Sequence, residues 1–228
     1  MGSKDSRGGG GGGFSTVTSV TGQGGHNIDL TDYPLRYGNH DSAISGATRA
    51  MLEAQETKRL DAKVEYGYAL DADGNLIGEK RGGRGSCSLP ASYYMNGEIL
   101  THNHPRTGDE AGTLGGTFST QDFKVLTVGN LKTMRASAAE GTYSITKGKN
   151  FDGAGLLKYR RQLEKDANAA AKKRVQEAGE RYKRGEISSS QLTQAAKDAS
   201  NRALVSIHNG LLAGQKDYGY SYTLERRA

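Results

Sequence analysis

The stretch "GEILTHNHP" at residues 97–105 places a short apolar run directly before two histidines and a proline. In a β-strand, residues i and i+2 point to the same side, so His102 and His104 project together and Asn103 faces the other way. Pro105 has no amide hydrogen to give to a strand ladder, so the strand is expected to end there. The stretch therefore predicts a strand that ends in two imidazoles on one face.

A β-hairpin is predicted upstream of this strand. In "KVEYGYALDADGNLIGEK" at residues 63–80, Val64, Tyr66, Tyr68 and Leu70 alternate before a tight turn at 71–75, and Leu76 and Ile77 begin the return strand. "GSCSLP" at 85–90 is expected to add a further short strand. Before the hairpin, Asp41 or Ser42 is expected to cap a helix over 42–59, whose inward face is predicted to hold Ala43, Ile44, Ala47, Ala50, Met51 and Ala54.

The sequence after Pro105 predicts a loop, a helix, a second hairpin and then two more helices. A glycine-rich loop at 106–118 precedes a short helix over 119–130, with Phe123, Leu126 and Thr127 inward. "KTMRASA" and "TYSITK" are expected to pair as strands. Helices at 156–183 and 188–212, broken at Gly185, are expected to form an antiparallel hairpin, and "YGYSYTLER" at 218–226 a closing strand with Tyr218, Tyr220, Tyr222 and Leu224 on one face.

These strands and helices are compatible with an α/β (α+β) fold. Residues 1–38 are expected to be a flexible, glycine-rich tether, because ordering the six consecutive glycines at 8–13 costs more entropy than it returns. Residues 39–150 are expected to form the core. Residues 151–228 are expected to form a helical hairpin and a closing strand that pack on this core.

Composition and charge narrow the classes of function. Cys87 is the only cysteine, so no disulfide framework can form, and no apolar run approaches the ~18 residues of a membrane span. The chain is therefore expected to be soluble and cytoplasmic. The formal net charge of +6 lies in residues 158–184, which hold ten Lys and Arg against four Asp and Glu. This basic helix either presents a solvated face or meets nucleic acid or an acidic protein.

Two imidazoles on one face of a strand end are the minimum for holding zinc. A catalytic zinc site takes a third protein ligand and leaves one position to water. Asp122 in "STQD" at 119–122 can supply that ligand from the first turn of the next helix. The same four residues also fit a capping box, in which Ser119 caps the helix and Asp122 answers it. Both interpretations can hold together, because a carboxylate has two oxygens.

Metal-assisted hydrolysis also needs a base. The upstream carboxylates in predicted ordered structure are Glu65, Glu79 and Glu98. Glu65 lies at the start of the first hairpin strand, between Val64 and Tyr66. A carboxylate at that position faces either solvent or a site, and the alternation alone leaves both open.

The order Glu65, "HNHP" at 102–105 and "STQD" at 119–122 resembles the JAMM (MPN+) metalloprotease family, whose motif is an upstream Glu, then H-x-H-P, then S-x-x-D. The form of these motifs is similar to RadC-type proteins and to the JAMM-like domains of tailed-phage minor head proteins. The resemblance covers about residues 60–150 and continues more weakly to "DYGYSYTL". It implies a curved mixed sheet flanked by helices.

The resemblance also implies roles for individual residues. His102, His104 and Asp122 would ligate zinc, Glu65 would act as general base on the zinc-activated water, and Ser119 would donate a hydrogen bond to the oxyanion. The implied reaction is hydrolysis of a peptide or isopeptide bond. The implied substrate is a protein or peptide, and a phage structural protein is an expected partner, in the bacterial cytoplasm or in the virion.

One departure from the family pattern concerns the segment between Pro105 and Ser119, which is longer than the family usually has. The loop at 106–118 is expected either to be a mobile flap over the cleft or to mark a site that no longer turns over. Two other functions stay open. One is a catalytically silent structural or adaptor module of a phage particle, and the other is a RadC-like protein that handles nucleic acid through the basic helix at 158–184.

Overall fold

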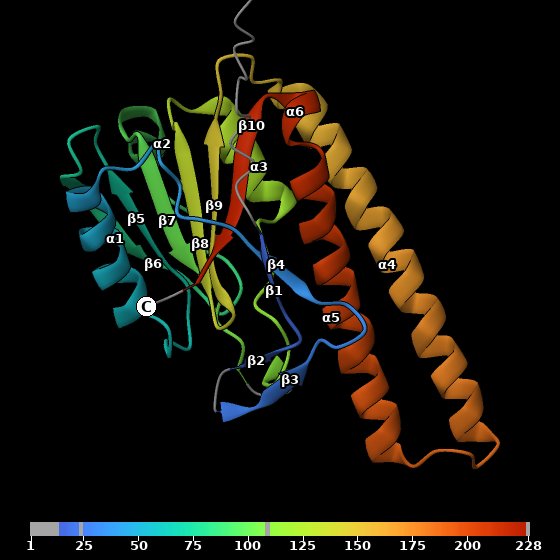
Figure 1. The fold of residues 1–228 in the computed structure, drawn as a ribbon. Coiled ribbons are helices and arrows are strands. Elements are labelled where there is room, and N and C mark those ends of the chain that lie inside the picture. Colours follow the sequence, from blue (N-terminus) through green and yellow to red (C-terminus); the bar gives the residue numbers. More distant parts are fainter. Residues whose placement is uncertain (1–13, 23–24, 108–109, 227–228) are drawn as a thin grey trace, which may run out of the picture.

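The computed structural model describes residues 14–22, 25–107 and 110–226. They form a mixed α/β fold, in which a six-stranded mixed sheet is flanked by helices (Figure 1). The glycine run at 8–13, expected to be part of a tether, lies outside the described residues. No helix within the described ranges is both long enough and apolar enough to cross a bilayer.

The strands of the large sheet lie in the order β10-β9-β8-β7-β5-β6. Only β7 and β8 are parallel within it, and every other neighbouring pair is antiparallel. Parallel neighbours need a crossover connection, which here contains α3 (Thr120–Val128). The carboxyl end of β7 and the start of α3 therefore lie at the same edge of the sheet. The six strands are β5 (Tyr66–Leu70), β6 (Leu76–Arg81), β7 (Ile99–Asn103), β8 (Thr133–Ala138), β9 (Gly141–Lys147) and β10 (Tyr220–Glu225).

Helices cover both faces of this sheet. On one face, Glu56 of α1 (Gly46–Lys58) reaches Thr101 of β7 and Arg135 of β8. On the other face, His208 of α5 (Ser189–Ala213) packs on Tyr143 of β9. α5 and α4 (Gly153–Lys183) form an antiparallel hairpin beside β10 that extends well past the sheet (Figure 1). The short helices are α2 (Ala91–Asn96) and α6 (Gln215–Tyr218).

The structure confirms both predicted hairpins, the strand at 99–103, and the helices around 120–128, 153–183 and 189–213. Gly185 follows α4 with φ +74°, as expected for a glycine that ends a helix. Tyr220, Tyr222 and Leu224 share the buried face of β10, whereas Tyr218 belongs to α6.

The prediction for α1 is wrong in its cap and in part of its inward face: Ile44 is buried and Met51 packs beside it, as expected, but the alanines are not buried. Ser45 caps the helix, while the Asp41 side chain accepts hydrogen bonds from Ser144 and Thr146 in the sheet. The buried positions are Thr48, Leu52 and Glu56, and the alanines at 47, 50 and 54 are exposed. The reason is physical: a buried ion pair of Glu56, rather than the apolar stripe, orients the helix.

Two further segments differ from expectation. Residues 85–90 form no strand, and α2 follows them directly. Residues 14–38, expected to belong to a tether, hold four three-residue strands in their described part and bury Ile28, Leu30, Leu35 and Tyr37 in the main core. These strands are β1 (Ser15–Val17) paired with β4 (Leu35–Tyr37), and β2 (Ser19–Thr21) paired with β3 (Asn27–Asp29).

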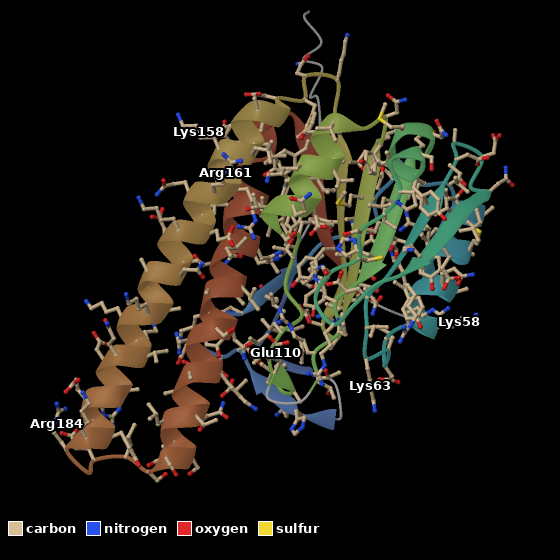
Figure 2. All side chains as sticks on the ribbon, turned by 180° about the vertical axis from the view of Figure 1, so that it is seen from behind. Lys58, Lys63, Glu110, Lys158, Arg161 and Arg184 are labelled. Carbon is tan, nitrogen blue, oxygen red and sulfur yellow. The ribbon has the colours of Figure 1, made fainter. Side chains whose placement is uncertain are left out.

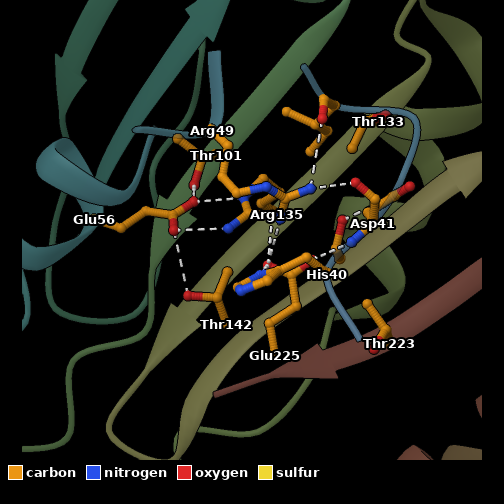
Figure 3. Close-up of polar contacts among 12 residues, drawn as sticks. His40, Asp41, Arg49, Glu56, Thr101, Thr133, Arg135, Thr142, Thr223 and Glu225 are labelled. Carbon is orange, nitrogen blue, oxygen red and sulfur yellow. Dashed lines mark hydrogen bonds and ion pairs between the residues drawn. The ribbon is translucent and has the colours of Figure 1, made fainter. Parts of the chain in front are cut away.

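Arg135 of β8 forms a buried ionic cluster between α1 and the sheet (Figure 3). Its guanidinium donates from Nε and Nη2 to the two carboxylate oxygens of Glu56, at 2.7 and 3.0 Å, and from Nη1 to Glu225 Oε2 at 3.0 Å. The hydroxyls of Thr101 and Thr142 also donate to Glu56. The three charged side chains are at most 3% exposed, and their ion pairs join α1, β8 and β10.

The basic stretch 158–184 runs along the exposed length of α4, where Figure 2 shows Lys158 and Arg161 near one end and Arg184 just past the other. Several of its cations have acidic neighbours on the same helix or just beyond it. The pairs are Arg160 with Glu164, Lys173 with Glu177, Lys183 with Glu180, and Arg184 with Glu186.

Replacing Arg135 by Met should lower the free energy of unfolding by about 3–5 kcal/mol, because buried Glu56 would lose its counter-ion and Glu225 would keep only Arg49 and His40 as partners. Urea unfolding followed by circular dichroism measures this loss. Arg161→Met, an exposed position on α4, is the control and should change stability by less than ~0.5 kcal/mol. Equal stability of the two variants would contradict the role given to Arg135.

The free energy of unfolding should also fall as the pH drops from 6.5 to about 4, because His208 takes up a proton when the protein unfolds in this range. Burial lowers the pKa of this ring from 6.5 to about 4; the charge of Arg36 adds to the effect, and the hydrogen bond that Nε2 donates to the Arg36 carbonyl acts against it. In this window the unfolded ring binds a proton that the folded ring does not, so acid favours unfolding by an amount on the order of 3 kcal/mol.

The measurement is urea unfolding at several pH values. His208→Gln should flatten the dependence, and His26→Gln, at an exposed position, should leave it as in the wild type. An unchanged slope in His208→Gln would show that other groups carry the acid sensitivity.

Candidate metal centre

One cavity of about 290 Å³ opens at the carboxyl end of β7, and all five residues predicted for the site line it. The crossover geometry explains how they meet: the strand ends and the helix begins at the same edge of the sheet. The seventeen residues between His104 and Asp122 therefore do not separate the two side chains in space. The five residues are Glu65, His102, His104, Ser119 and Asp122.

The register of β5 and β7 places Glu65 on the same face as the histidines. Gly67 of β5 lies opposite His102 in the antiparallel pair. Glu65 is two residues before Gly67, so its side chain points to the same side of the sheet. Glu79 and Glu98, the other carboxylates considered, pair with Arg59 and Lys132 and do not line the cavity.

The two imidazoles face each other through their Nε2 atoms, which lie 2.9 Å apart. The Nδ1 atom of His104 lies 2.9 Å from the carbonyl oxygen of Gly116. A carbonyl only accepts, so Nδ1 carries the proton and Nε2 of the neutral ring keeps a free lone pair. Burial, with a contribution from the neighbouring His102, lowers the pKa of His104 to about 4 and favours this neutral form.

Asp122 acts at once as a helix cap and as a member of the cluster. Its Oδ2 accepts from the backbone amide and the hydroxyl of Ser119, each at 2.7 Å, and Ser119 Oγ accepts from the Asp122 amide. Its Oδ1 lies 3.6 Å from His102 Nε2. Burial favours the protonated carboxyl, but the charge of His102 and the hydrogen bonds outweigh it and lower the pKa of Asp122.

Glu65 stands in a different environment from Asp122. Burial is the main cause that raises the pKa of its carboxyl, and Asp122 adds to this, while His102 and Arg106 act against it. A carboxylate with a raised pKa holds a proton more readily than one in water. The cavity therefore contains one strongly ionised carboxylate beside the histidines and a second that is better suited to proton transfer.

Asn103, between the two histidines, fixes the start of β5 from the other side of the sheet. Its Oδ1 accepts from the Tyr66 amide at 2.7 Å, and its Nδ2 donates to the carbonyl oxygens of Val64 and Arg59 at 3.2 and 3.3 Å. These backbone groups lie on both sides of Glu65. Alternate residues of one strand thus supply the two imidazoles and position the nearby carboxylate.

The part of the loop nearest α3 is packed, since residues 113–118 are buried. The Glu140 carboxylate accepts from the amides of Gly115 and Gly116 at 2.9 and 2.8 Å, and Gly116 in turn presents its carbonyl to His104. Gly116 has φ +79°, and a Cβ there would lie 2.7 Å from Leu204, so the position requires glycine.

The helical hairpin braces the same segment. Asn201 of α5 accepts from the Leu114 amide at 2.9 Å. Arg160 of α4 donates to the Phe118 carbonyl at 3.1 Å, and the Thr120 hydroxyl donates to Glu164 at 2.8 Å. The segment that supports His104 and begins α3 is therefore held from the sheet and from both long helices.

Within the described residues, His102, His104 and Asp122 are the one group of three or more possible ligands whose donor atoms converge, all within 4.8 Å of one another. Two imidazole nitrogens and one carboxylate oxygen are a donor set that divalent transition metals accept, and three protein ligands leave a position open. The residues present thus fit a bound metal ion.

Three features of the site could not be predicted from the sequence. Glu140 lies in the turn between β8 and β9 and looked like an ordinary turn residue. The Gly116 carbonyl is a backbone group. Cys87, which the sequence did not assign to the site, is half-buried and also lines the cavity.

Replacing Glu140 by Gln should weaken binding of added Zn²⁺ by about 10–100-fold. The side-chain nitrogen of Gln cannot accept a hydrogen bond, so the backbone N–H of either Gly115 or Gly116 would lose its acceptor. The Gly116 carbonyl and the His104 ring would then lose their fixed positions. Competition against a chromophoric chelator measures the affinity. Glu177→Gln, at an exposed position on α4, is the control, and equal affinities would contradict the role of Glu140.

Comparison of the chain with protein-family models, with curated proteins and with solved structures returned no match.

Proposed function

We propose that this chain is a zinc-dependent peptidase or isopeptidase of JAMM type that hydrolyses a peptide or isopeptide bond. The observation that carries the proposal is the cavity itself, where Glu65 stands beside His102, His104 and Asp122 without belonging to the converging ligand group. A metal site that only stabilises a fold does not need a further carboxylate. The order of these residues also matches the resemblance given by the sequence.

The ligands would be Nε2 of His102, Nε2 of His104 and Oδ1 of Asp122, which already face one another. Zinc supplies a Lewis acid that polarises a carbonyl group and lowers the pKa of water toward ~7. Two of these ligands are oriented by hydrogen bonds on the side away from the proposed metal. His104 donates to the Gly116 carbonyl, and Asp122 accepts from the Ser119 hydroxyl.

Glu65 is the proposed general base. It takes a proton from the attacking water and returns it to the amine that leaves, so one carboxyl group serves both half-reactions. Its raised pKa, caused mainly by burial, suits this shuttle. Ser119 has the hydroxyl that the resemblance assigns to the oxyanion, but here that hydroxyl donates to Asp122, so the role requires it to turn toward substrate.

The alternatives predict different behaviour of the same protein. A silent module of a phage particle would hold zinc without cleaving peptides, or hold none. A nucleic-acid protein would use α4, where several cations already pair with acidic neighbours. The resemblance favours a phage structural protein as substrate or partner, met in the bacterial cytoplasm or in the virion.

Glu65→Gln should keep one zinc ion per chain and lose activity by about 10²–10⁴-fold, because the amide cannot accept the proton. His104→Ala should lose both the metal and the activity. Elemental analysis and cleavage of a peptide library measure the two properties. Glu79→Gln, on β6 and outside the cavity, is the matched control and should keep both.

Cleavage by Glu65→Gln at the rate of the wild type would show that the base is wrongly assigned. A wild-type protein that binds zinc and cleaves no member of the library would favour the silent module instead. DNA binding with a log–log salt slope near zero would remove the nucleic-acid alternative.

A further inference from the structure

The cavity of the metal centre has an apolar end that the proposed chemistry does not use. Besides the polar residues, its lining includes four apolar side chains: Leu89, Tyr94, Leu100 and Val125. Leu100 is buried, and the other three are half-buried against the main core. Among the described residues, no lysine or arginine lines the cavity, and the acidic residues of its lining are Glu65 and Asp122 at the metal end.

Strand β7 sets the spacing between the two ends. Leu100 and His102 alternate along it, and His104 follows directly after its last residue, Asn103, on the same face. Two strand residues span about 6.6 Å, so the apolar floor lies one such step from the first imidazole. An extended peptide whose carbonyl lies at the metal end places the side chain of a neighbouring residue at about this distance.

The walls of the apolar end are fixed by packing. Leu89 lies directly over Gly67, where a Cβ would come within 2.8 Å of it, so this glycine lets Leu89 approach the sheet beside His102. On the opposite side, the Tyr94 carbonyl accepts from the Asn130 amide at 2.9 Å, which ties α2 to the end of α3. Val125 lies on α3 itself. The hollow is therefore already formed.

Size and charge restrict the occupant. A cavity of about 290 Å³ is at the lower limit of small-molecule sites, so it has room for the reacting groups and one side chain but not for a large cofactor. An acidic side chain would meet the two carboxylates and no cation in the lining. A branched aliphatic side chain would bury its methyl groups against three elements at once.

We propose that this apolar end is the specificity subsite, which takes a large aliphatic side chain of the residue that flanks the scissile bond. The proposal rests on the proposed function, because it places the scissile carbonyl at the metal end. The substrate class is thus a protein or peptide with leucine, isoleucine or methionine next to the cleaved bond. Val125 and Leu89 would contact this side chain and determine the preference for it.

Hydroxamates test the subsite without turnover, since they bind a zinc ion directly. The zinc-loaded protein is titrated by calorimetry with the hydroxamates of N-acetylglycine, N-acetylleucine and N-acetylaspartate. The leucine compound should bind at least about tenfold more tightly than the glycine compound, as expected for burial of an isobutyl group. The aspartate compound should bind no more tightly than the glycine compound.

Val125→Ser and Leu89→Ser should each reduce the leucine-over-glycine ratio by about threefold or more and leave the affinity for glycine hydroxamate and for zinc unchanged. Val128→Ser, one turn further along α3 and 65% exposed outside the cavity, is the matched control and should keep the full ratio. A leucine preference that survives both substitutions, or equal binding of all three compounds, overturns the subsite.

Peptide cleavage then separates the two proposals. If the protein prefers the leucine compound but cleaves no peptide, the subsite stands and the proposed peptidase activity is wrong. If it cleaves peptides at the same rate whatever residue flanks the bond, the peptidase activity stands and the subsite is wrong. A wild-type chain that binds no zinc removes both.

Discussion

The arrangement of the sheet and of helix α1 on it depends on the ion pairs of the buried Arg135 guanidinium. A charge removed from water needs partners, and here Glu56 and Glu225 supply them from α1 and β10 (Figure 3). The pairing sets the face that α1 presents to the sheet and holds the last strand in place. Thr101, which also donates to Glu56, is the neighbour of His102 in β7, so the same cluster supports the strand that carries the histidines.

A second constraint, the parallel pairing of β7 and β8, brings the site together. The crossover returns the chain so that the end of one strand and the start of α3 share an edge, and both histidines and Asp122 then lie in one cavity. Each polar group there has a separate task. The two oxygens of Asp122 point to different partners, and Asn103 and Gly116 orient their neighbours through backbone groups.

Local pattern was sufficient for much of this fold. Alternation predicted the hairpins, and the order of Glu65, the histidines, Ser119 and Asp122 predicted residues that do line one cavity. The errors share a physical cause, which is dependence on distant partners. The face of α1 follows from an arginine 79 residues away, and the three-residue strands near the amino terminus carry too little alternation to stand out. The support that Glu140 gives to Gly116 is visible only after folding.

The packed segment before α3 changes what counts as one unit in this chain. The sequence suggests a boundary near residue 150, with a catalytic core before it and a helical appendage after it. Yet Asn201, Arg160 and Glu164 all hold residues between 114 and 120, and these lead directly to His104 and Asp122. A fragment ending at residue 150 would keep the three candidate ligands but lose Asn201, Arg160 and Glu164, which support the segment that positions His104 and Asp122. The candidate metal site thus depends on described residues from both sides of position 150.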